Sequence, residues 1–524
     1  MQVMGWAKRI LGIGALTSAL LAQPWPALGQ GAEAAGGQKM DLAAVGALLQ
    51  QLQVQVQDLH AQVKDLKAQQ LSAQEQSAAL RKELDDAKLQ LVALAAPVTT
   101  GPPLSATGVA AMAVATDERI GRLEESVQLS DSKAAEQSQT KVESGSKYRV
   151  RLSGIVLLNL TGNRGTVDNT DFPQLAEQQG LLGSSGSFGG SLRQSQIGIE
   201  AFGPTIAGAR TSADVRFDFA GGFPDAPNGV SFGIMRLRTG TVRFDWTDTS
   251  VVAGQDSLFF APLSPTSIAT LAVPAMAYSG NLWSWTPQVR VEHKFAVSES
   301  SSLKVQGGIL DSLSGDTPFT GYERSPSWGE YSGQPAYAAR VAWTQNINGQ
   351  NMTIGAGGYY GRQLWGYGRS VDSWAGTIDF SVPLGSKFEF TSQFYRGRAI
   401  GGLGGGIGQT GLWNGSLLDS TTEVEGLDSM GGWAQLKYKA TPKLQFNGAY
   451  GIDNPFAAEL REYGGNTTYF QVPLSRNQSE FVNFIYQPRS DIVFSLEYRR
   501  LKTFTLDSIA NGANVINFSV GYLF

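Results

Sequence analysis

The chain has 524 residues, a formal net charge of −4, 42% hydrophobic and 16% charged residues, 63 glycines and no cysteine. Its charged fraction lies well below the roughly 25% of average soluble domains, which argues against an ordinary charged surface. The near-neutral charge without a basic cluster excludes a nucleic-acid-binding protein, and the lack of cysteine excludes disulfides and thiolate metal sites.

The first 29 residues have the pattern of a cleaved bacterial secretory signal peptide. Lys8 and Arg9 precede the apolar run 10–22, and small residues at 27–29 stand where a signal peptidase cleaves. A single transmembrane anchor is the alternative, but this run has about 13 residues and a spanning helix needs about 20. We therefore expect residues 1–29 to be removed during export.

Residues 41–95 have the heptad pattern of a coiled coil. From Leu49 to Leu94, apolar or small residues recur at alternating spacings of three and four, with mainly Gln, Lys, Asp and Glu elsewhere. One solvated helix is the alternative, but a helix with such a seam needs a partner. We therefore predict a homo-oligomeric periplasmic rod, roughly 70 Å long at about 1.5 Å per residue.

A segment rich in Ala, Gly, Pro and Thr follows the predicted rod. Residues 96–116 carry no charge, and a short heptad-like piece at Ile120, Leu123 and Val127 precedes a polar stretch. We interpret 96–147 as a flexible linker that contains a short helix.

From Tyr148 onward, polar and apolar residues alternate in segment after segment, which is typical of β-strands. In 207–219, for example, apolar residues and Thr occupy every second position between polar or charged ones. Sixteen such segments are expected: 148–161, 194–202, 207–219, 234–246, 249–256, 286–297, 303–310, 335–346, 352–361, 374–382, 387–397, 431–439, 443–454, 480–488, 491–503 and 512–524.

The connections between these segments alternate between short turns and long loops. A soluble β-sandwich has no reason to sort its loops by length, whereas an even-stranded outer-membrane barrel has short turns on one side and long loops on the other. The fold class is therefore an all-β transmembrane barrel of about 16 antiparallel strands, spanning 148–524 and preceded by the α-helical coiled coil. The expected long loops are 162–193, 220–233, 257–285, 311–334, 362–373, 398–430, 455–479 and 504–511.

One predicted strand, 234–246, breaks the alternation because Arg236 and Arg238 would face lipid. A bulge at Gly240 would turn both arginines toward the lumen, together with Arg243 and Asp245. A regular ladder through Gly240 would contradict this prediction.

Charged residues on the strands are expected to face the lumen, because Arg or Lys at the lipid midplane costs about 2–4 kcal/mol. Many of the arginines could simply pair with neighbouring carboxylates and stiffen the wall. As a set, they indicate a polar channel with a mild anion preference. The predicted pore-lining residues are Arg149, Arg151, Arg210, Asp214, Arg216, Asp218, Arg236, Arg238, Arg290, Glu292, Lys294, Arg340, Asp379, Glu389, Glu497 and Arg499.

The predicted loop 257–285 is long and carries no charge. Apart from its serine and threonine hydroxyls, its residues are mostly apolar or small. Such a loop either folds into the barrel and narrows it or contacts a neighbouring subunit, and we favour a constriction loop. Its candidate solute-facing residues are Phe259, Phe260, Ser264, Thr266, Ser267, Trp283 and Trp285.

The sequence offers few residues for catalysis. His60 lies on the predicted coiled coil, and His293 lies in an otherwise outward-facing row whose neighbours Glu292 and Lys294 should point the other way. The glycine-rich run 401–408 lacks the βαβ context of a phosphate-binding loop. We therefore expect no enzyme activity, no cofactor and no metal site, although a barrel hydrolase that uses His293 stays as a weaker alternative.

The chain ends in a strand pattern that places Ile516, Phe518, Val520, Tyr522 and Phe524 on one face. We expect this last strand to pair with the first one and close the barrel, which removes the exposed edge. Tyr522 and the terminal Phe524 also resemble the signal that the bacterial barrel-assembly machinery reads.

A secretory signal, a coiled coil and about sixteen strands ending in an aromatic residue resemble the DcaP-like porins of Gram-negative outer membranes. The resemblance covers nearly the whole mature chain in architecture but carries over no solute contact. It implies a homotrimeric channel for small, often aromatic, carboxylates. Phosphate-selective porins are less similar, because they line the pore with lysines and this barrel region is lysine-poor.

We therefore expect an outer-membrane porin for passive diffusion of small hydrophilic solutes, with its coiled coil in the periplasm. Its expected partners are two further copies of the chain, outer-membrane lipid and lipopolysaccharide, the barrel-assembly machinery and, through the rod, peptidoglycan. The alternative is a structural protein whose coiled coil links the outer membrane to the cell wall.

Overall fold

The computed structural model describes residues 149–524 except 182, 317–323, 468–471 and 508. Residues 1–147 lie outside the described residues. They include the predicted signal peptide (1–29), coiled coil (41–95) and linker (96–147).

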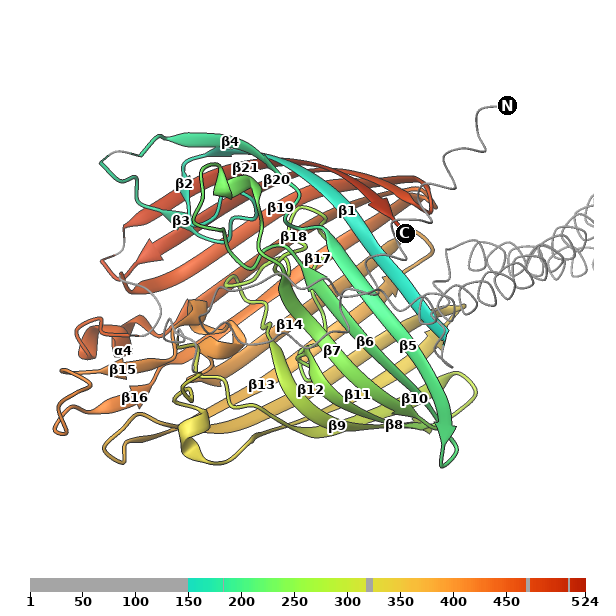
Figure 1. Ribbon diagram of the computed structural model, residues 1–524, viewed down its shortest axis with the longest axis horizontal. Coiled ribbons are helices and arrows are strands. Elements are labelled where there is room, and N and C mark those ends of the chain that lie inside the picture. The colour runs from blue at the N-terminus through green and yellow to red at the C-terminus, as the bar shows by residue number, and fades with distance from the viewer. Residues whose placement is uncertain (1–148, 182, 317–323, 468–471, 508) are drawn as a thin grey trace, which may run out of the picture. The chain divides into compact units, whose positions relative to one another are not determined.

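The described residues form a closed antiparallel barrel of sixteen strand positions (Figure 1). Each strand pairs with the next along the chain, and the last pairs with the first. All sixteen predicted strands are confirmed, with shifted ends: β1 (Arg149–Arg164), β5 (Gln196–Ile206), β6 (Ala209–Asp218), β7 (Arg236–Asp245), β8 (Thr249–Ser257), β9 (Trp285–Ala296), β10 (Ser301–Leu310), β11 (Ala336–Ile347), β12 (Gln350–Leu364), β13 (Ser370–Leu384), β14 (Phe388–Arg398), β17 (Asp428–Thr441), β18 (Leu444–Pro455), β19 (Leu474–Arg489), β20 (Ile492–Thr505) and β21 (Ala510–Leu523).

The second position of the barrel is shared by two strands. β5 pairs with the first half of β1, over 149–155, and β4 (Gly186–Ser191) pairs with its second half, over 159–164. The chain between them leaves the ladder, and there Ser195 donates its hydroxyl hydrogen to the Leu157 carbonyl and accepts the Leu157 amide. One barrel position is therefore built from two short strands.

Short elements occupy the long connections. They are the β2 (Thr166–Val167) and β3 (Ala176–Glu177) pair, the β15 (Gly411–Trp413) and β16 (Val424–Gly426) pair, α4 (Ala457–Glu462), η1 (Gly229–Ser231), η2 (Glu330–Ser332), η3 (Gly401–Leu403) and η4 (Gly406–Gly408). Among the described residues, no helix is both long and apolar enough to cross a bilayer.

Two of the predicted long loops are short. β12 continues to Leu364 and β13 begins at Ser370, while β20 continues to Thr505 and β21 begins at Ala510. The strands extend because their polar residues still alternate and pair: Arg362 on β12 binds Asp372 on β13 at 2.9 Å. The separation of long loops at one end of the barrel from short turns at the other is therefore less strict than the sequence predicted.

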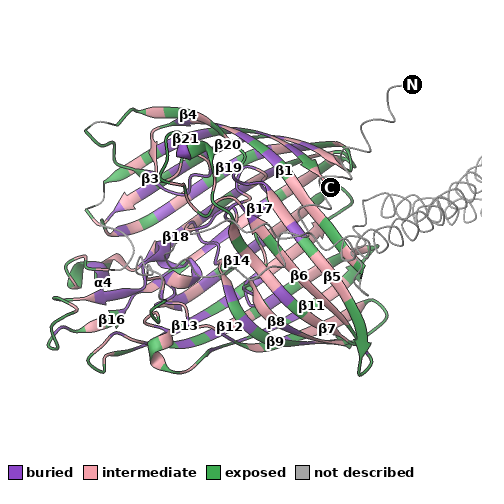
Figure 2. Cartoon of the chain, viewed as in Figure 1, coloured by how far each residue is buried: buried purple, intermediate pink, exposed green. Residues whose placement is uncertain are grey.

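Side chains alternate between the two faces of the wall, and Figure 2 shows the resulting stripes of buried and exposed residues. On β13, Trp374 and Ile378 are exposed on the outside, whereas Ser373, Thr377 and Asp379 are buried inside. The outer face is apolar and aromatic, as a lipid-facing surface requires.

The bulge expected on β7 exists, but two residues away from the predicted position. Gly240 pairs regularly with Val215 and Gln255, so the prediction of a bulge at Gly240 is wrong. The extra residue is Arg238, which has no partner on β6. The bulge shifts the alternation by one residue, so Arg236 and Arg238 can point inward to the buried Asp218 although Val242, farther along the same strand, faces outward.

Candidate functional site

The connection between β8 and β9 folds into the barrel and contacts its inner wall in succession. Phe260 is fully buried and stacks on Tyr359 of β12 with ring centroids 5.4 Å apart. Its carbonyl accepts a hydrogen bond of 2.6 Å from the Thr377 hydroxyl on β13. The Leu263 amide then donates to Gln393 Oε1 on β14 at 3.3 Å. We call residues 258–284 the inner loop.

The middle of the inner loop binds β17, β19 and β20. The Thr266 amide donates to Gln435 Oε1 at 2.6 Å, and the Thr266 carbonyl accepts from Asn483 Nδ2 at 3.0 Å. Ser267 donates its hydroxyl hydrogen to Glu497 Oε2 at 2.5 Å. These polar residues of the loop are thus engaged with the wall.

The inner loop next reaches the opposite wall. The carbonyls of Leu271 and Ala272 accept hydrogen bonds from Arg238 at 2.5 Å and Arg236 at 2.7 Å, both on β7. Gln194, just before β5, binds the loop with both ends of its side-chain amide. Because its contacts run from β12 through β20 to β7, the loop spans the interior instead of covering one strand.

The return path of the inner loop also packs against the wall. Ala275 and Met276 contact Trp433, Ala449 and Phe481, which point inward from β17, β18 and β19. At Gly280 (φ +94) the loop lies so close to β17 and β18 that a Cβ there would be 2.4 Å from backbone atoms of both strands. Only glycine fits this close approach, so the loop is seated at a specific place.

Two other connections fold inward over the inner loop. Phe172 packs against Ala272 and Val273, and Leu175 packs against Ile407. The first turn is held by Asp168, whose Oδ1 accepts the amide hydrogens of Gln174 and Leu175, each at 2.9 Å. Desolvation by the surrounding loop raises the pKa of Asp168 to about 6 from its ordinary value of 3.8, although the residue keeps an exposed surface.

The structure places the predicted loop residues as follows. Phe259 and Phe260 are buried against the wall, and the Ser264 hydroxyl accepts from Asn281 within the loop at 3.0 Å. Trp283 and Trp285 meet edge to face with centroids 5.6 Å apart. The guanidinium groups of Arg236 and Arg238 lie over the Trp285 ring at 5.0 and 4.5 Å.

Part of the predicted pore lining consists of buried ion pairs beneath the loops. Asp218 is fully buried and binds Arg236 at 2.7 Å and Arg238 at 3.1 Å. Arg499 binds Glu497 at 2.8 Å, and both are 2% exposed, so their charges compensate each other. Such pairs stiffen the wall and hold the loop, and removing one partner would leave a buried charge.

Two further buried arginines connect neighbouring strands. Arg290 on β9 binds Glu292 at 2.7 Å and Asp256 on β8 at 2.8 Å. Arg340 on β11 reaches over β12 to Asp379 on β13, with Nη2 to Oδ1 at 2.6 Å. Gly355 on β12 leaves the space for this crossing, because a Cβ there would be 2.4 Å from both charged groups.

The remaining charged residues of the inner face are half-buried or exposed, apart from the buried Glu292, and lie mostly toward the short turns. The carboxylates there are paired: Arg151 with Glu200 at 3.5 Å, Arg243 with Asp245 at 3.1 Å, and Lys439 with Glu389 at 2.9 Å. Among the described residues of this half, the cations outnumber the carboxylates. The cations are Arg149, Arg151, Arg210, Arg216, Arg243, Lys294, Lys304, Lys437 and Lys439, and the carboxylates are Glu200, Asp214, Asp245, Glu292 and Glu389.

Among the described residues, no carboxylate pairs with Arg149, Arg210 or Lys294. Arg149 instead lies over the Phe202 ring at 4.7 Å. Arg210 lies opposite Asp245 in the ladder, but no ion pair is formed between them.

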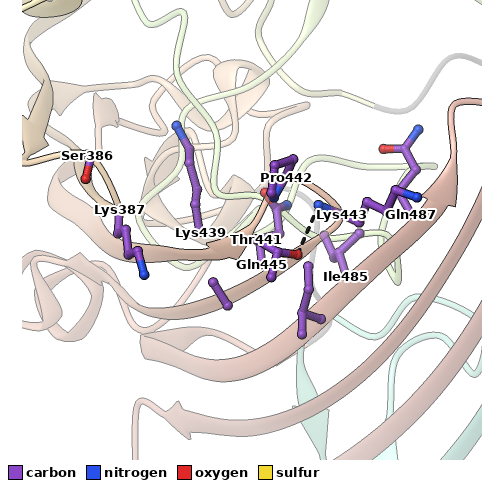
Figure 3. A pocket seen from close by; sticks show the side chains of 11 residues that line it. Ser386, Lys387, Lys439, Thr441, Pro442, Lys443, Gln445, Ile485 and Gln487 are labelled. Carbon is purple, nitrogen blue, oxygen red and sulfur yellow. Dashed lines mark hydrogen bonds between the residues drawn. The ribbon is translucent and has the colours of Figure 1, made fainter. Parts of the chain in front are cut away.

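Lysines missed by the sequence-based site prediction line a pocket of about 520 Å³ at the short-turn end of β14, β17 and β18. Figure 3 shows Lys387, Lys439 and Lys443 around it, with Gln445 and Gln487. Lys437 and Lys439 could have been found in the sequence, since they alternate with the outward Tyr438. Lys387 and Lys443 lie at the turns, where no periodicity assigns a face.

His293, the residue on which an enzymatic alternative would depend, lies on the outer face. Its Nδ1 is 2.8 Å from the Thr249 hydroxyl, and its ring contacts Phe295 edge to face. Glu292 points to the interior, where it binds Arg290 and Lys304. Within the described part of the chain, no cluster of three or more His, Asp or Glu residues is arranged to hold a metal ion.

No protein-family model matches the chain, and no curated protein does so. Among solved structures, the outer membrane channel DcaP of Acinetobacter baumannii is similar, with a TM-score of 0.57 and 17% identity over 74% of this chain and 100% of its own. An anion-selective porin from Comamonas acidovorans matches with a TM-score of 0.44 and 11% identity over 72% and 100%. OmpT of Vibrio cholerae matches with a TM-score of 0.42 and 11% identity over 74% and 100%. The likeness to DcaP shows a shared fold, which is the sixteen-stranded barrel that the sequence resemblance implied.

Proposed function

We propose that the protein is an outer-membrane porin through which small hydrophilic solutes diffuse, with a preference for anions. The observation that carries this proposal is the surplus of exposed cations on the inner face of the short-turn half. A row of like charges on a pore wall raises the local concentration of counter-ions. The solved structure of similar fold is an outer membrane channel, which supports the same class of function.

The two halves of the barrel have different roles in this proposal. In the long-loop half, the inner loop and the connections above it occupy the interior and set the size limit. In the short-turn half, Arg149, Arg210 and Lys294 face the solute path without a paired carboxylate and attract anions. Because arginine binds carboxylates in a planar, bidentate manner, small carboxylates are the solute class that fits best.

Selectivity is tested by neutralising two of the unpaired cations. The double variant Arg210→Gln/Lys294→Gln should lower the anion-to-cation permeability ratio roughly two- to fivefold, since a unit charge acts on an ion in water with about 1 kcal/mol at 4 Å. The matched control is Arg362→Gln, which removes one arginine from the outer face. Equal reversal potentials for the double variant and the wild type in a salt gradient would contradict the anion preference.

We propose the same partners that the sequence predicts, beginning with two further copies of the chain. Three copies of the chain should assemble through the barrel and the predicted coiled coil, which chemical cross-linking of the full chain in membranes tests. Deleting 41–95 distinguishes the tethering alternative: loss of envelope attachment with unchanged conductance would make the tether the main role of that segment. The short-turn half would then still function as a channel.

A further inference from the structure

The outer face of β17–β21 carries an apolar groove of about 540 Å³. Its floor lies at Gly448, where a Cβ would meet only the Val482 side chain at 3.9 Å. Across the strands, Leu436, Gly448, Val482, Tyr498 and Ile516 stand side by side in the ladder. Since glycine contributes no side chain in the middle of this row, the wall is indented there.

Aromatic rings border this groove on the side toward the short turns. Phe388 and Tyr438 stack with centroids 4.8 Å apart, and Phe446 continues the row 6.3 Å from Tyr438. Rings in such a row are rigid and apolar, and they hold the shape of the groove. The groove therefore offers a preformed surface for hydrocarbon chains.

Cations lie directly beyond the groove on the side toward the long loops. The next outward row, two residues or about 7 Å farther along the strands, contains Glu480, Arg500, Asn514 and Arg164. Beyond that row, Lys502 and Arg476 lie over the Phe504 ring at 5.0 and 5.6 Å. We call Arg164, Arg476, Arg500 and Lys502 the outer basic patch.

The outer basic patch has an excess of positive charge. Among the described residues of these outward rows, the one carboxylate is Glu480, which lies 3.8 Å from Arg500 with both side chains more than half exposed. Three outward arginines on β12 and β14 at this end of the barrel are instead paired with carboxylates. Arg362 binds Asp372, Arg396 binds Asp428 and Arg398 binds Glu425.

We propose that the groove and the outer basic patch together bind a phosphorylated glycolipid of the outer leaflet, the membrane anchor of lipopolysaccharide. Its acyl chains lie along the groove, and its phosphates bind the patch. A phosphate bearing nearly two negative charges is the partner that several arginines and a lysine at one level of the membrane would recognise. The proposal needs the barrel to lie in an outer membrane with its long loops outward, but it does not need the channel to conduct.

The order of these features along the strands matches the order of such a lipid. From the short turns toward the long loops, the outer face presents aromatic rings, an apolar groove and then cations. If the headgroup of a lipid lies at the long-loop side, its acyl chains lie against the rings and the groove, and its phosphates lie against the cations. A lipid of the opposite leaflet would bring its phosphates to the short turns, away from the patch.

The test uses the full chain purified in detergent and diphosphoryl lipid A as the probe. Binding is measured by native mass spectrometry, with the same lipid lacking both phosphates as a second probe. The double variant Arg500→Gln/Lys502→Gln should bind the diphosphoryl lipid about tenfold more weakly and the phosphate-free lipid unchanged. Gly448→Leu, which fills the groove, should weaken both lipids. Arg489→Gln, at the short-turn end of β19, is the matched control and should alter neither.

Each outcome decides between the proposal and its alternatives. If Arg500→Gln/Lys502→Gln binds the diphosphoryl lipid as the wild type does, the patch is not the phosphate site and the proposal is wrong. If Gly448→Leu also binds both lipids as the wild type does, the groove has no role in lipid binding. Conductance of the same variants, which should be unchanged, is measured separately, so that a failed channel and a failed lipid site are distinguishable.

Discussion

Replacing Phe260 with alanine should detach the start of the inner loop from the barrel wall. Phe260 is 0% exposed and stacks on Tyr359, and its carbonyl accepts from Thr377. Truncating a buried Phe costs about 3–5 kcal/mol, and the lost aromatic pair is part of that cost. Because the inner loop is a separate segment, we expect the cost to appear as loop opening while the barrel itself stays folded.

The magnitude can be read from hydrogen exchange. A local cost of about 3 kcal/mol raises the population of the detached loop roughly hundredfold, since 1.4 kcal/mol corresponds to a factor of ten. Amides such as those of Leu263 and Thr266, which donate to the wall, should then exchange faster by a similar factor. Single-channel recordings of the variant should show larger and more variable conductance.

The control for this variant is Phe394→Ala on β14. Phe394 is 49% exposed on the outer face, so its removal changes the aromatic surface and leaves the inner loop untouched. If Phe260→Ala shows the exchange and conductance of the wild type, the inner loop is not held by this contact, and its role as the size limit would have to be abandoned.

Three further predictions concern the wall, the inward connections and barrel closure. Arg340→Leu should destabilise the barrel by about 3–5 kcal/mol because Asp379 stays buried without a partner, and adding Asp379→Leu should recover much of the loss in urea unfolding. Since the surrounding loop raises the pKa of Asp168 to about 6, its turn should be most stable below about pH 3.8 and lose stability as the pH rises through 6; Asp168→Asn should remove this pH dependence from the exchange of the Leu175 amide, and an unchanged dependence would contradict the assignment. Deleting Phe524, which exchanges backbone hydrogen bonds with the first strand, should reduce the yield of heat-modifiable barrel in membranes far more than it alters reversal potentials.

The sequence predicted the barrel well because period-two alternation is a local signal that tertiary contacts reinforce. Each strand must be apolar outward and polar inward, so its sixteen segments could be read one by one. The broken alternation in 234–246 predicts a bulge at Gly240. The structure puts it at Arg238, since the buried Asp218 binds two arginines, and no local pattern reveals that long-range requirement.

The interior was harder to predict, because which part of an inward face meets solvent depends on loops far along the chain. Alternation placed Arg340 and Lys294 in one class, yet Arg340 is buried in an ion pair and Lys294 is exposed. Whether an inward residue is buried or exposed depends on where the inner loop lies. The uncharged composition of that loop left two possibilities open, folding into the barrel or contact with a neighbouring subunit. The lysines at turns, such as Lys443, carry no periodic signal at all.

The most direct test of an anion-preferring channel is single-channel recording of the purified full chain in planar bilayers, with the reversal potential measured in a potassium chloride gradient. We expect discrete conductance steps and a reversal potential of the sign produced by chloride passing more readily than potassium. The absence of conductance steps would contradict the channel function, and a reversal potential of the opposite sign would contradict the role of the exposed cations of the short-turn half.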